Sequence, residues 1–299
     1  MRAFFCDTYV IPLPPGHRFP TPKYRLLRER LVAEGVLAAA ELEEADLIDR
    51  ATLLYAHTPE YVEAVFAGAL DEDEQRRLGF PWSEGLVARS RASCFGTLAA
   101  AREALSDGIA GNLAGGTHHA FAGGGNGFCV FNDVAVAARA LQREGAIERA
   151  VVVDLDVHQG DGTAAIFAGD DSVFTFSMHG AKNFPFRKQR SSLDVELPDG
   201  CRDTEYISQL AEHLPRVLDA ARAQILFFVA GVDPLAQDVL GRLDLSLEGL
   251  RRRDRLVLAA ARERGIPIVL TLGGGYAKPI DLSVDAHIGT WREARAVFG

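Results

Sequence analysis

A cluster of acidic and imidazole side chains follows three consecutive valines near the middle of the chain. The valines, residues 151–153, are typical of a buried strand because β-branched apolar side chains suit sheets. The next eight positions hold three carboxylates and one imidazole, namely Asp154, Asp156, His158 and Asp161. On an extended backbone Asp156 and His158 point to the same side. Such oxygen and nitrogen donors suit a divalent metal and leave coordination positions open.

Four other predicted strands also end in polar or glycine-rich sequence. These ends are residues 115–119, 177–180, 231–234 and 273–276. In parallel α/β sheets, ligands bind at the carboxyl ends of the strands. We therefore expect all five strand ends to contribute to one site.

Asp156, His158 and Asp233 are the predicted metal ligands. Two carboxylates and one imidazole leave room for water and a substrate oxygen, as in a catalytic metal site. Zinc fits these donors best, and ferrous iron is the second choice. The alternative is that Asp156 and Asp233 are helix N-caps and that His158 is an ordinary loop histidine.

The remaining polar side chains at these strand ends could transfer protons. His118 and His119 follow two glycines, which allow the backbone to bend so that both imidazoles face one cavity. Asp154 and Asp161 could each orient one of these imidazoles through its second ring nitrogen. The phenol of Tyr276 could donate a hydrogen bond to an oxyanion beside the metal. Exposed loop histidines and an aromatic plug over the sheet edge are the alternatives.

Residues 123–128, Gly-Gly-Gly-Asn-Gly-Phe, form the most glycine-rich stretch of the chain. The stretch lacks the spacing of a dinucleotide or phosphate loop. We interpret it as a flexible wall on which Phe128 lines a narrow tunnel for an apolar chain. Packing of Phe128 in the core is the alternative.

Strand and helix patterns alternate along the chain, which predicts an α/β fold with a central parallel sheet and helices on both faces. Strands are predicted at residues 2–6, 109–114, 150–155, 172–177, 224–230 and 266–272. Helices are predicted at residues 22–35, 85–105, 133–144, 205–223 and 247–264, with a further helix starting at Thr58-Pro59. Residues 182–200 are predicted to be a long surface loop, and the cluster 251–253 a solvated helix face.

Composition limits the classes of protein to consider. The 299 residues are 48% hydrophobic, which suffices for one large core. The net charge of -9 argues against a nucleic-acid partner and is compatible with a cationic substrate. The four cysteines form no C-x-x-C pair, which favours a reducing compartment. No targeting or membrane-spanning segment is evident, so a cytoplasmic location without a membrane partner is expected.

Five motifs together resemble those of the zinc-dependent histone deacetylase superfamily, which includes acetylpolyamine amidohydrolases and acetoin-utilisation proteins. The motifs are residues 115–119, 127–133, 154–162, 231–233 and 272–276. The resemblance spans nearly the whole chain. Residues 12–20, Pro-Leu-Pro-Pro-Gly-His-Arg-Phe-Pro, look most like the class IV branch and its bacterial relatives.

This resemblance implies an arginase/deacetylase fold, with residues 1–299 forming one catalytic domain. It implies that Asp156, His158 and Asp233 bind zinc. His119 would be the general base and acid, with His118 as its partner. The remaining implied catalytic residues are Asp154 and Asp161, which support the two histidines, and Tyr276, the oxyanion donor.

The resemblance also implies a structural potassium ion and a substrate tunnel. Asp154 and Ser177 match positions around the potassium ion, together with the zinc ligands Asp156 and His158. The tunnel would be lined by Gly127, Phe128 and Phe184, with Phe186 as an alternative to Phe184. At Gln159 the chain departs from family members that carry a second histidine, and little loss is expected because this position binds no metal.

Arginase-type hydrolases share the fold but use two metals. Position 160, two residues past His158, is glycine, and so is position 231, where carboxylates for a second metal would be expected. A mononuclear site is therefore predicted. The expected reaction is hydrolysis of an N-acyl amide, most simply an acyl-lysine side chain of a protein or peptide. The alternatives are a deacetylase of acetylpolyamines or other small acylated amines, and a non-catalytic acyl-lysine binder.

Overall fold

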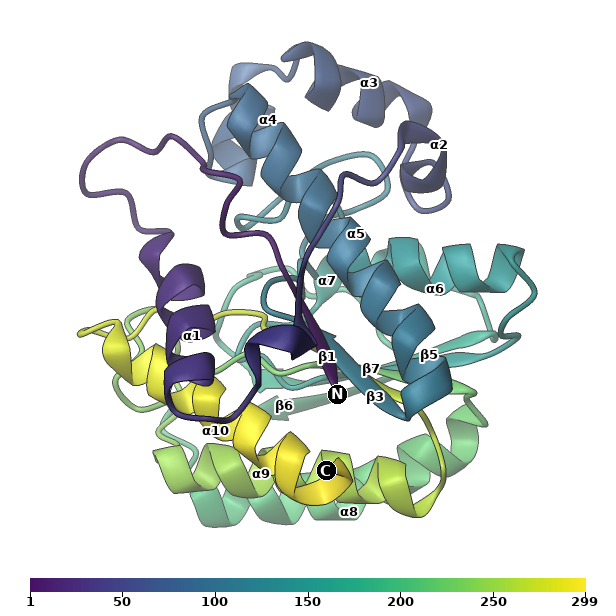
Figure 1. Ribbon diagram of the computed structural model, residues 1–299, viewed down its shortest axis with the longest axis vertical. Coiled ribbons are helices and arrows are strands. Elements are labelled where there is room, and N and C mark those ends of the chain that lie inside the picture. The colour runs from purple at the N-terminus through teal and green to yellow at the C-terminus, as the bar shows by residue number, and fades with distance from the viewer.

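Eight parallel strands form one sheet at the centre of the protein (Figure 1). The computed structural model describes residues 1–299. The strand order is β2-β1-β3-β8-β7-β4-β5-β6, and every neighbouring pair is parallel. The strands are β1 (Arg2–Phe5), β2 (Leu42–Glu44), β3 (Ile109–Asn112), β4 (Ala150–Asp154), β5 (Val173–Gly180), β6 (Leu193–Leu197), β7 (Ile225–Val229) and β8 (Ile268–Thr271).

Helices cover both faces of the sheet (Figure 1). One face packs against α5 (Glu84–Asp107) and α6 (Asp133–Arg143). The other packs against α1 (Pro22–Ala33), α8 (Asp203–Ala221), α9 (Leu247–Glu263) and α10 (Asp281–Phe298). The remaining helices are α2 (Arg50–Leu53), α3 (Pro59–Ala67), α4 (Glu72–Leu78), α7 (Asp161–Ile166) and the 3-10 helix η1 (Ala39–Glu41). The α/β fold class is confirmed.

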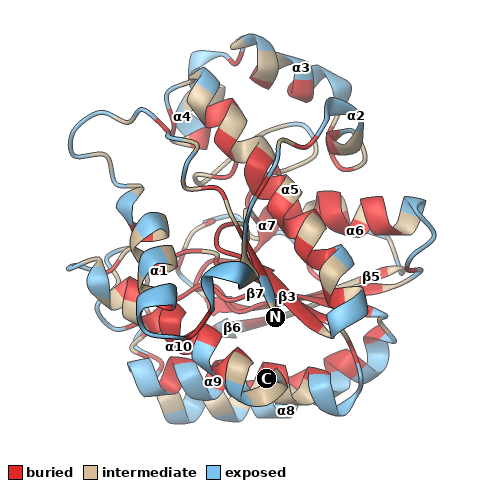
Figure 2. Ribbon diagram, in the orientation of Figure 1, coloured by how far each residue is buried: buried red, intermediate tan, exposed pale blue.

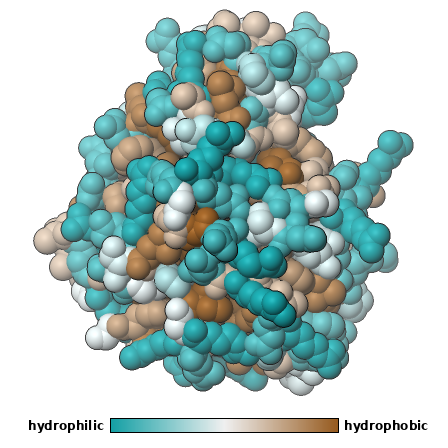
Figure 3. All heavy atoms as spheres, turned by 90° about the vertical axis from the view of Figure 1, so that its right-hand side faces the viewer, coloured by the Kyte–Doolittle hydropathy of each residue, from teal (hydrophilic) through white to brown (hydrophobic).

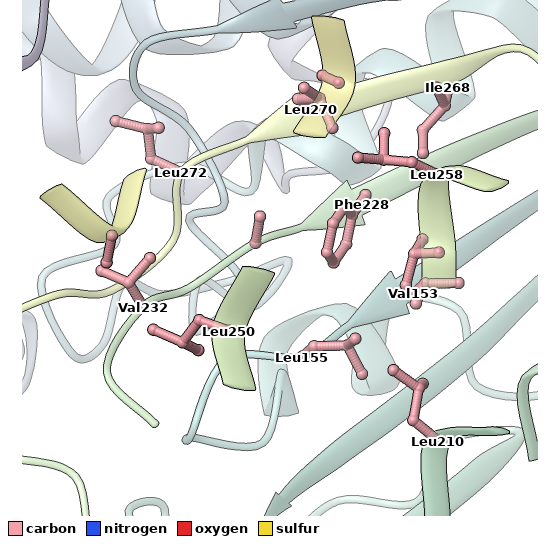
Figure 4. Close-up of a cluster of buried hydrophobic side chains, with 14 of the residues drawn as sticks. Val153, Leu155, Leu210, Phe228, Val232, Leu250, Leu258, Ile268, Leu270 and Leu272 are labelled. Atoms are coloured by element: carbon pink, nitrogen blue, oxygen red, sulfur yellow. The ribbon is translucent and has the colours of Figure 1, made fainter. Parts of the chain in front are cut away.

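The central strands β4 and β7 are apolar along nearly their whole length because alternate side chains enter different cores. Val151 and Val153 of β4 belong to the core beneath α8 and α9, whereas Val152 belongs to the core beneath α5 and α6. Figure 4 shows Val153 and Phe228 in the first of these cores. Side chains alternate across a strand, so a sheet covered on both faces requires continuous apolar runs.

Burial follows the same layers. In Figure 2 the buried residues lie on the strands and on the helix surfaces that face them, and exposed residues lie on the outer helix surfaces and loops. Hydrophilic side chains cover most of the face shown in Figure 3, with smaller hydrophobic patches between them. None of the helices combines the length and the hydropathy that spanning a bilayer requires.

Side-chain caps begin several of the helices. Thr58 accepts a hydrogen bond from the Tyr61 amide, and Pro59 is the first residue of α3, as the Thr-Pro pair predicts. Asn132 caps α6 in the same manner by accepting from the Ala135 amide at 3.0 Å. This cap positions the start of α6 beneath the loop that carries the two adjacent histidines.

Several elements differ from the sequence predictions, including the short helices η1, α2, α4 and α7, which were not predicted. The region predicted as a surface loop, residues 182–200, contains strand β6, which pairs with β5 at the edge of the sheet. Only Val195 and Leu197 of this strand are buried, so its apolar pattern is too short to recognise. Strand β2 and helix α10 were not predicted.

The prediction that residues 251–253 form a solvated helix face is wrong for Arg253. Its side chain is fully buried and donates to the carbonyl oxygens of Leu155, at 3.2 Å, and Gly231, at 2.5 Å. These carbonyls lie just beyond β4 and β7. The buried guanidinium therefore joins two of the strand ends that carry the candidate site.

Candidate active site

A cavity of about 1000 Å³ opens at the carboxyl ends of the strands. Its lining includes side chains from the ends of β3, β4 and β8 and from the loops around them. His118, His119, Asp156, His158 and Tyr276 all line it. These residues come from three of the five strand ends expected to converge, and Asp233 adds a fourth next to the cavity, whereas no residue of 177–180 belongs to the lining.

The three predicted metal ligands lie together next to this cavity. One donor atom each from Asp156, His158 and Asp233 lies within 4.8 Å of the other two. His158 Nδ1 is 2.9 Å from Asp156 Oδ1 and 3.1 Å from Asp233 Oδ2. All three residues are buried. Asp156 and His158 follow β4, and Asp233 follows β7, its neighbour in the sheet.

Backbone amides hold the two carboxylates in place. Asp156 Oδ2 accepts from the Gly274 amide at 2.7 Å, and Asp233 Oδ1 accepts from the Val157 amide at 2.9 Å. Asp233 Oδ2 is buried, and although His158 Nδ1 lies 3.1 Å away, no contact to this oxygen has the geometry of a hydrogen bond. An unpaired buried carboxylate oxygen is unfavourable unless a cation is near it.

The charges of the three ligands favour a cation at this point. Burial, and then the negative charge of Asp156, raise the pKa of Asp233 to about 7. Burial alone would lower the pKa of His158, but Asp233 and Asp156 raise it to about 10. The two carboxylates therefore draw positive charge to the centre of the cluster. The donor set and the orphaned oxygen fit a divalent metal ion.

Each of the adjacent histidines is hydrogen-bonded to its own aspartate. His118 Nδ1 lies 2.6 Å from Asp154 Oδ2, and His119 Nδ1 lies 2.5 Å from Asp161 Oδ1. All four residues are buried. Because Nδ1 is engaged by a carboxylate, Nε2 is the ring nitrogen left for chemistry in each case.

The two imidazoles differ in charge. Burial, followed by the positive charge of His118, lowers the pKa of His119 to about 4, so that His119 is neutral and can accept a proton. Burial would also lower the pKa of His118, but Asp154 and Asp156 raise it to about 9. A cation at Asp156 would oppose this second effect.

Tyr276 lies on the loop after β8, and its ring lines the cavity. Its backbone amide donates to Asp238 Oδ2 at 2.6 Å, which holds the backbone at Tyr276 in place. Burial raises the pKa of the Tyr276 phenol well above its usual value, so the hydroxyl keeps its proton and can donate it in a hydrogen bond.

Aromatic side chains form the walls of the cavity. Phe184 lies with its ring centroid 4.9 Å from that of His119. Phe128 packs 5.3 Å from Phe80 and 6.2 Å from Tyr276. Phe128 has a φ of +66°, a backbone conformation that non-glycine residues rarely adopt, and Gly127 before it has a φ of +51°. This turn directs the Phe128 ring to the cavity.

Close approach of the loops requires glycine at two positions. A side chain at Gly231 would overlap the Asp156 carboxylate, and one at Gly274 would overlap Asp233 Oδ2. Space at position 231 is therefore already filled by the Asp156 carboxylate. The mononuclear site remains a prediction.

Ser177 lies beside Asp154 in the sheet, because the two are register partners on β5 and β4. Its hydroxyl is 2.9 Å from Nδ1 of His179. Both side chains named for the predicted potassium site thus come from adjacent strands, and Ser177 is buried. Gln159 donates hydrogen bonds to Gln189 and Asp194 rather than to the predicted metal ligands.

Two further positioning residues lie behind the site. Asp133 accepts hydrogen bonds from the Gly116 and Thr117 amides and thereby holds the loop that leads into His118. Asp238 accepts from the amides of Tyr276 and Leu240. The amides held by Asp133 lie 16 and 17 residues earlier, and the Tyr276 amide lies 38 residues after Asp238, so sequence spacing offers no signal for either role.

Comparisons with known proteins agree on one family. The family model of the histone deacetylase domain matches residues 17–290. A protein of Picosynechococcus sp. whose function is uncharacterized is 48% identical over 290 residues, which is 97% of each chain. Histone deacetylase 2 of Arabidopsis thaliana is 32% identical over 88% of this chain and 70% of that relative. The structure of an HDAC homologue from Aquifex aeolicus covers 99% of this chain and 84% of its own, with 25% identity and a TM-score of 0.86.

Proposed function

The chain belongs to the histone deacetylase family, and we propose that it is a metal-dependent hydrolase of acyl-lysine side chains. Membership of this family supports the deacylation of amides as its reaction. The observation that carries this proposal is the grouping of three metal-ligand side chains, two histidine–aspartate pairs and a tyrosine around one cavity. A pure acyl-lysine binder has no need of a proton-transfer pair. We propose that residues 1–299 form one catalytic domain.

Asp156, His158 and Asp233 would hold the metal, with zinc as our first choice and ferrous iron as the second. Such an ion, when bound, polarises a carbonyl and lowers the pKa of water. We further propose that Asp154 and Ser177, neighbours on β4 and β5, contribute to a structural potassium site.

The protein's own residues then move the protons. His119 accepts a proton at Nε2 from the water that attacks the acyl carbon, while Asp161 stabilises the imidazolium that forms. Tyr276 donates a hydrogen bond to the oxyanion, a contact whose removal typically reduces the rate by about 100-fold or more. A protonated imidazole of the His118–His119 pair gives its proton to the amine nitrogen as the C–N bond breaks. The products are a carboxylic acid and a free lysine.

Phe128 and Phe184 would enclose the apolar stem of the acyl-lysine, with Gly127 allowing close approach. Enclosure by aromatic side chains excludes water from the reacting amide and holds it in position. The buried end of the cavity would then receive the acyl group.

The test is hydrolysis of acetyl-lysine peptides by the wild-type protein and by His119→Ala. We expect the variant to lose turnover while its metal content, measured by mass spectrometry, stays near that of the wild type. His213→Ala, on the outer part of α8, is the matched control and should retain full activity. A chelator should abolish wild-type activity and zinc should restore it. An active His119→Ala variant would refute the assignment of the base.

A further inference from the structure

The mouth of the cavity carries a ring of positive charge on a chain that is negative as a whole. The net charge of the chain is -9. Five exposed basic side chains line the outer part of the cavity: Arg18, Arg76, Arg77, Lys182 and Arg242. Asp156, a buried metal-ligand candidate, is the one carboxylate residue in the lining. The charge at the entrance is therefore opposite to the charge of the molecule.

These five cations come from four separate parts of the chain. Arg18 precedes α1, Arg76 and Arg77 lie at the end of α4, Lys182 follows β5, and Arg242 precedes α9. A row of cations on one helix is often simply a solvated face. Here the fold brings cations from unrelated segments to one opening, so a shared solvated helix face does not account for the ring.

Carboxylates of the protein neutralise the ring only in part. Arg18 and Arg77 form no ion pair. Arg76 pairs with Asp73, but both side chains are more than 70% exposed, and such pairs contribute little. The first turn of α4 is acidic, yet none of its carboxylates lines the cavity.

The remaining two cations share a single carboxylate. Asp199 is 3.0 Å from Arg242 and 3.7 Å from Lys182. One negative charge between two positive charges leaves a net positive charge on this side of the mouth. Phe186 and Val239, which are 87% and 52% exposed, add an apolar surface at the same opening.

We propose that this basic mouth selects acyl-lysine peptides whose flanking residues are acidic. The inference rests on the proposed function and names its substrate class. Opposite charges at the entrance attract such a peptide and raise the rate of productive encounter. The same ring repels acetylpolyamines, which are cationic along their length. The overall charge of the chain favours a cationic substrate, but the entrance, which the substrate actually meets, has the opposite sign.

The experiment measures both binding and hydrolysis of matched peptides. Three acetyl-lysine peptides differ only in the two residues on each side of the lysine. These residues are Asp and Glu in the acidic peptide, Ser in the serine peptide and Arg in the arginine peptide. Dissociation constants are measured by fluorescence anisotropy at about 50 mM and 500 mM salt. We expect the acidic peptide to bind about tenfold more tightly than the serine peptide at low salt, with most of this margin lost at high salt.

Two charge variants identify the residues responsible. Arg18→Glu combined with Arg77→Glu should remove or reverse the preference for the acidic peptide. Arg18→Gln combined with Arg77→Gln should weaken this preference, and it provides the test if the first double variant does not fold. Arg252→Glu, an exposed residue of α9 outside the cavity, is the control and should keep the preference.

The outcomes separate this inference from the proposed function. Equal or tighter binding of the serine or arginine peptide, or of an acetylated polyamine, would overturn the inference. Tighter binding of an oligonucleotide of equal charge would overturn the inference and identify a nucleic acid as the ligand of the mouth. Acidic preference without hydrolysis of any peptide would refute the proposed function and leave the role of the mouth intact.

Discussion

The hydrogen bond between His119 and Asp161 allows a quantitative test of the proton-transfer step. Its length is 2.5 Å, and the two side chains are 6% and 3% exposed. Asp161→Asn keeps the size of the side chain and leaves an amide oxygen that can accept from Nδ1. The substitution therefore removes the negative charge while preserving the geometry.

The expected loss follows from the charge state of His119 during the reaction. His119 is neutral at rest because burial, and then His118, lower its pKa to about 4. When His119 accepts a proton in the Asp161→Asn variant, the imidazolium faces a neutral amide instead of the carboxylate that stabilises it. A hydrogen bond to a charged group contributes about 1.5–3 kcal/mol, against about 0.5–1.5 kcal/mol for a neutral one. Allowing for the lost attraction between buried charges, we expect the barrier to rise by about 1.5–3 kcal/mol.

A barrier higher by this amount corresponds to a fall in kcat of about tenfold to about 100-fold. KM should change little, because the substrate binds while His119 is neutral. The assay is steady-state hydrolysis of an acetyl-lysine peptide, together with metal content and thermal unfolding. Asp219→Asn, which alters an exposed pair with Arg264, is the matched control. A kcat of Asp161→Asn within twofold of the wild type, at equal metal content, would refute the role of Asp161.

Two other properties can be tested in the same preparations. His57 donates from Nδ1 to Phe121 O and accepts the Asn132 amide at Nε2, and burial lowers its pKa to about 4. The folded protein favours neutral His57, and the stability gained in this way is complete above pH 6.5 and declines as the pH falls toward 4. The free energy of urea unfolding should therefore fall by about 2 kcal/mol from pH 7.5 to 5, a loss that His57→Gln lacks. Equal pH dependence of the two proteins would contradict this. Gly231→Ala would displace the Asp156 carboxylate, and metal affinity after dialysis should fall about 10-fold to 100-fold, whereas Gly124→Ala, with open space around it, should bind metal normally.

The sheet and the metal cluster were predictable because their signals are local. Consecutive apolar residues identify the central strands, and the two-residue spacing of Asp156 and His158 places both on one side of the chain after β4. The position of Asp233 could be predicted for a related reason, since it follows another apolar strand. The roles assigned to these side chains remain predictions for the experiments above.

The features that sequence reasoning missed depend on distant partners. Arg253 was expected in solvent, yet its partners Leu155 and Gly231 lie 98 and 22 residues earlier in the chain. Strand β6 has one strand neighbour and only two buried residues, so its pattern resembles a loop. The sign of charge at the cavity mouth was equally hidden, because it arises from four segments that meet only after folding.

None of the five cations at the mouth belongs to a strand of the sheet. Their side chains are exposed, so exchanging them leaves the two hydrophobic cores and the buried histidine–aspartate pairs untouched. Recognition and chemistry are thus carried by physically separate layers of the same molecule. A combinatorial library confined to these positions could redirect the enzyme to new acylated targets while its reaction machinery stays unaltered.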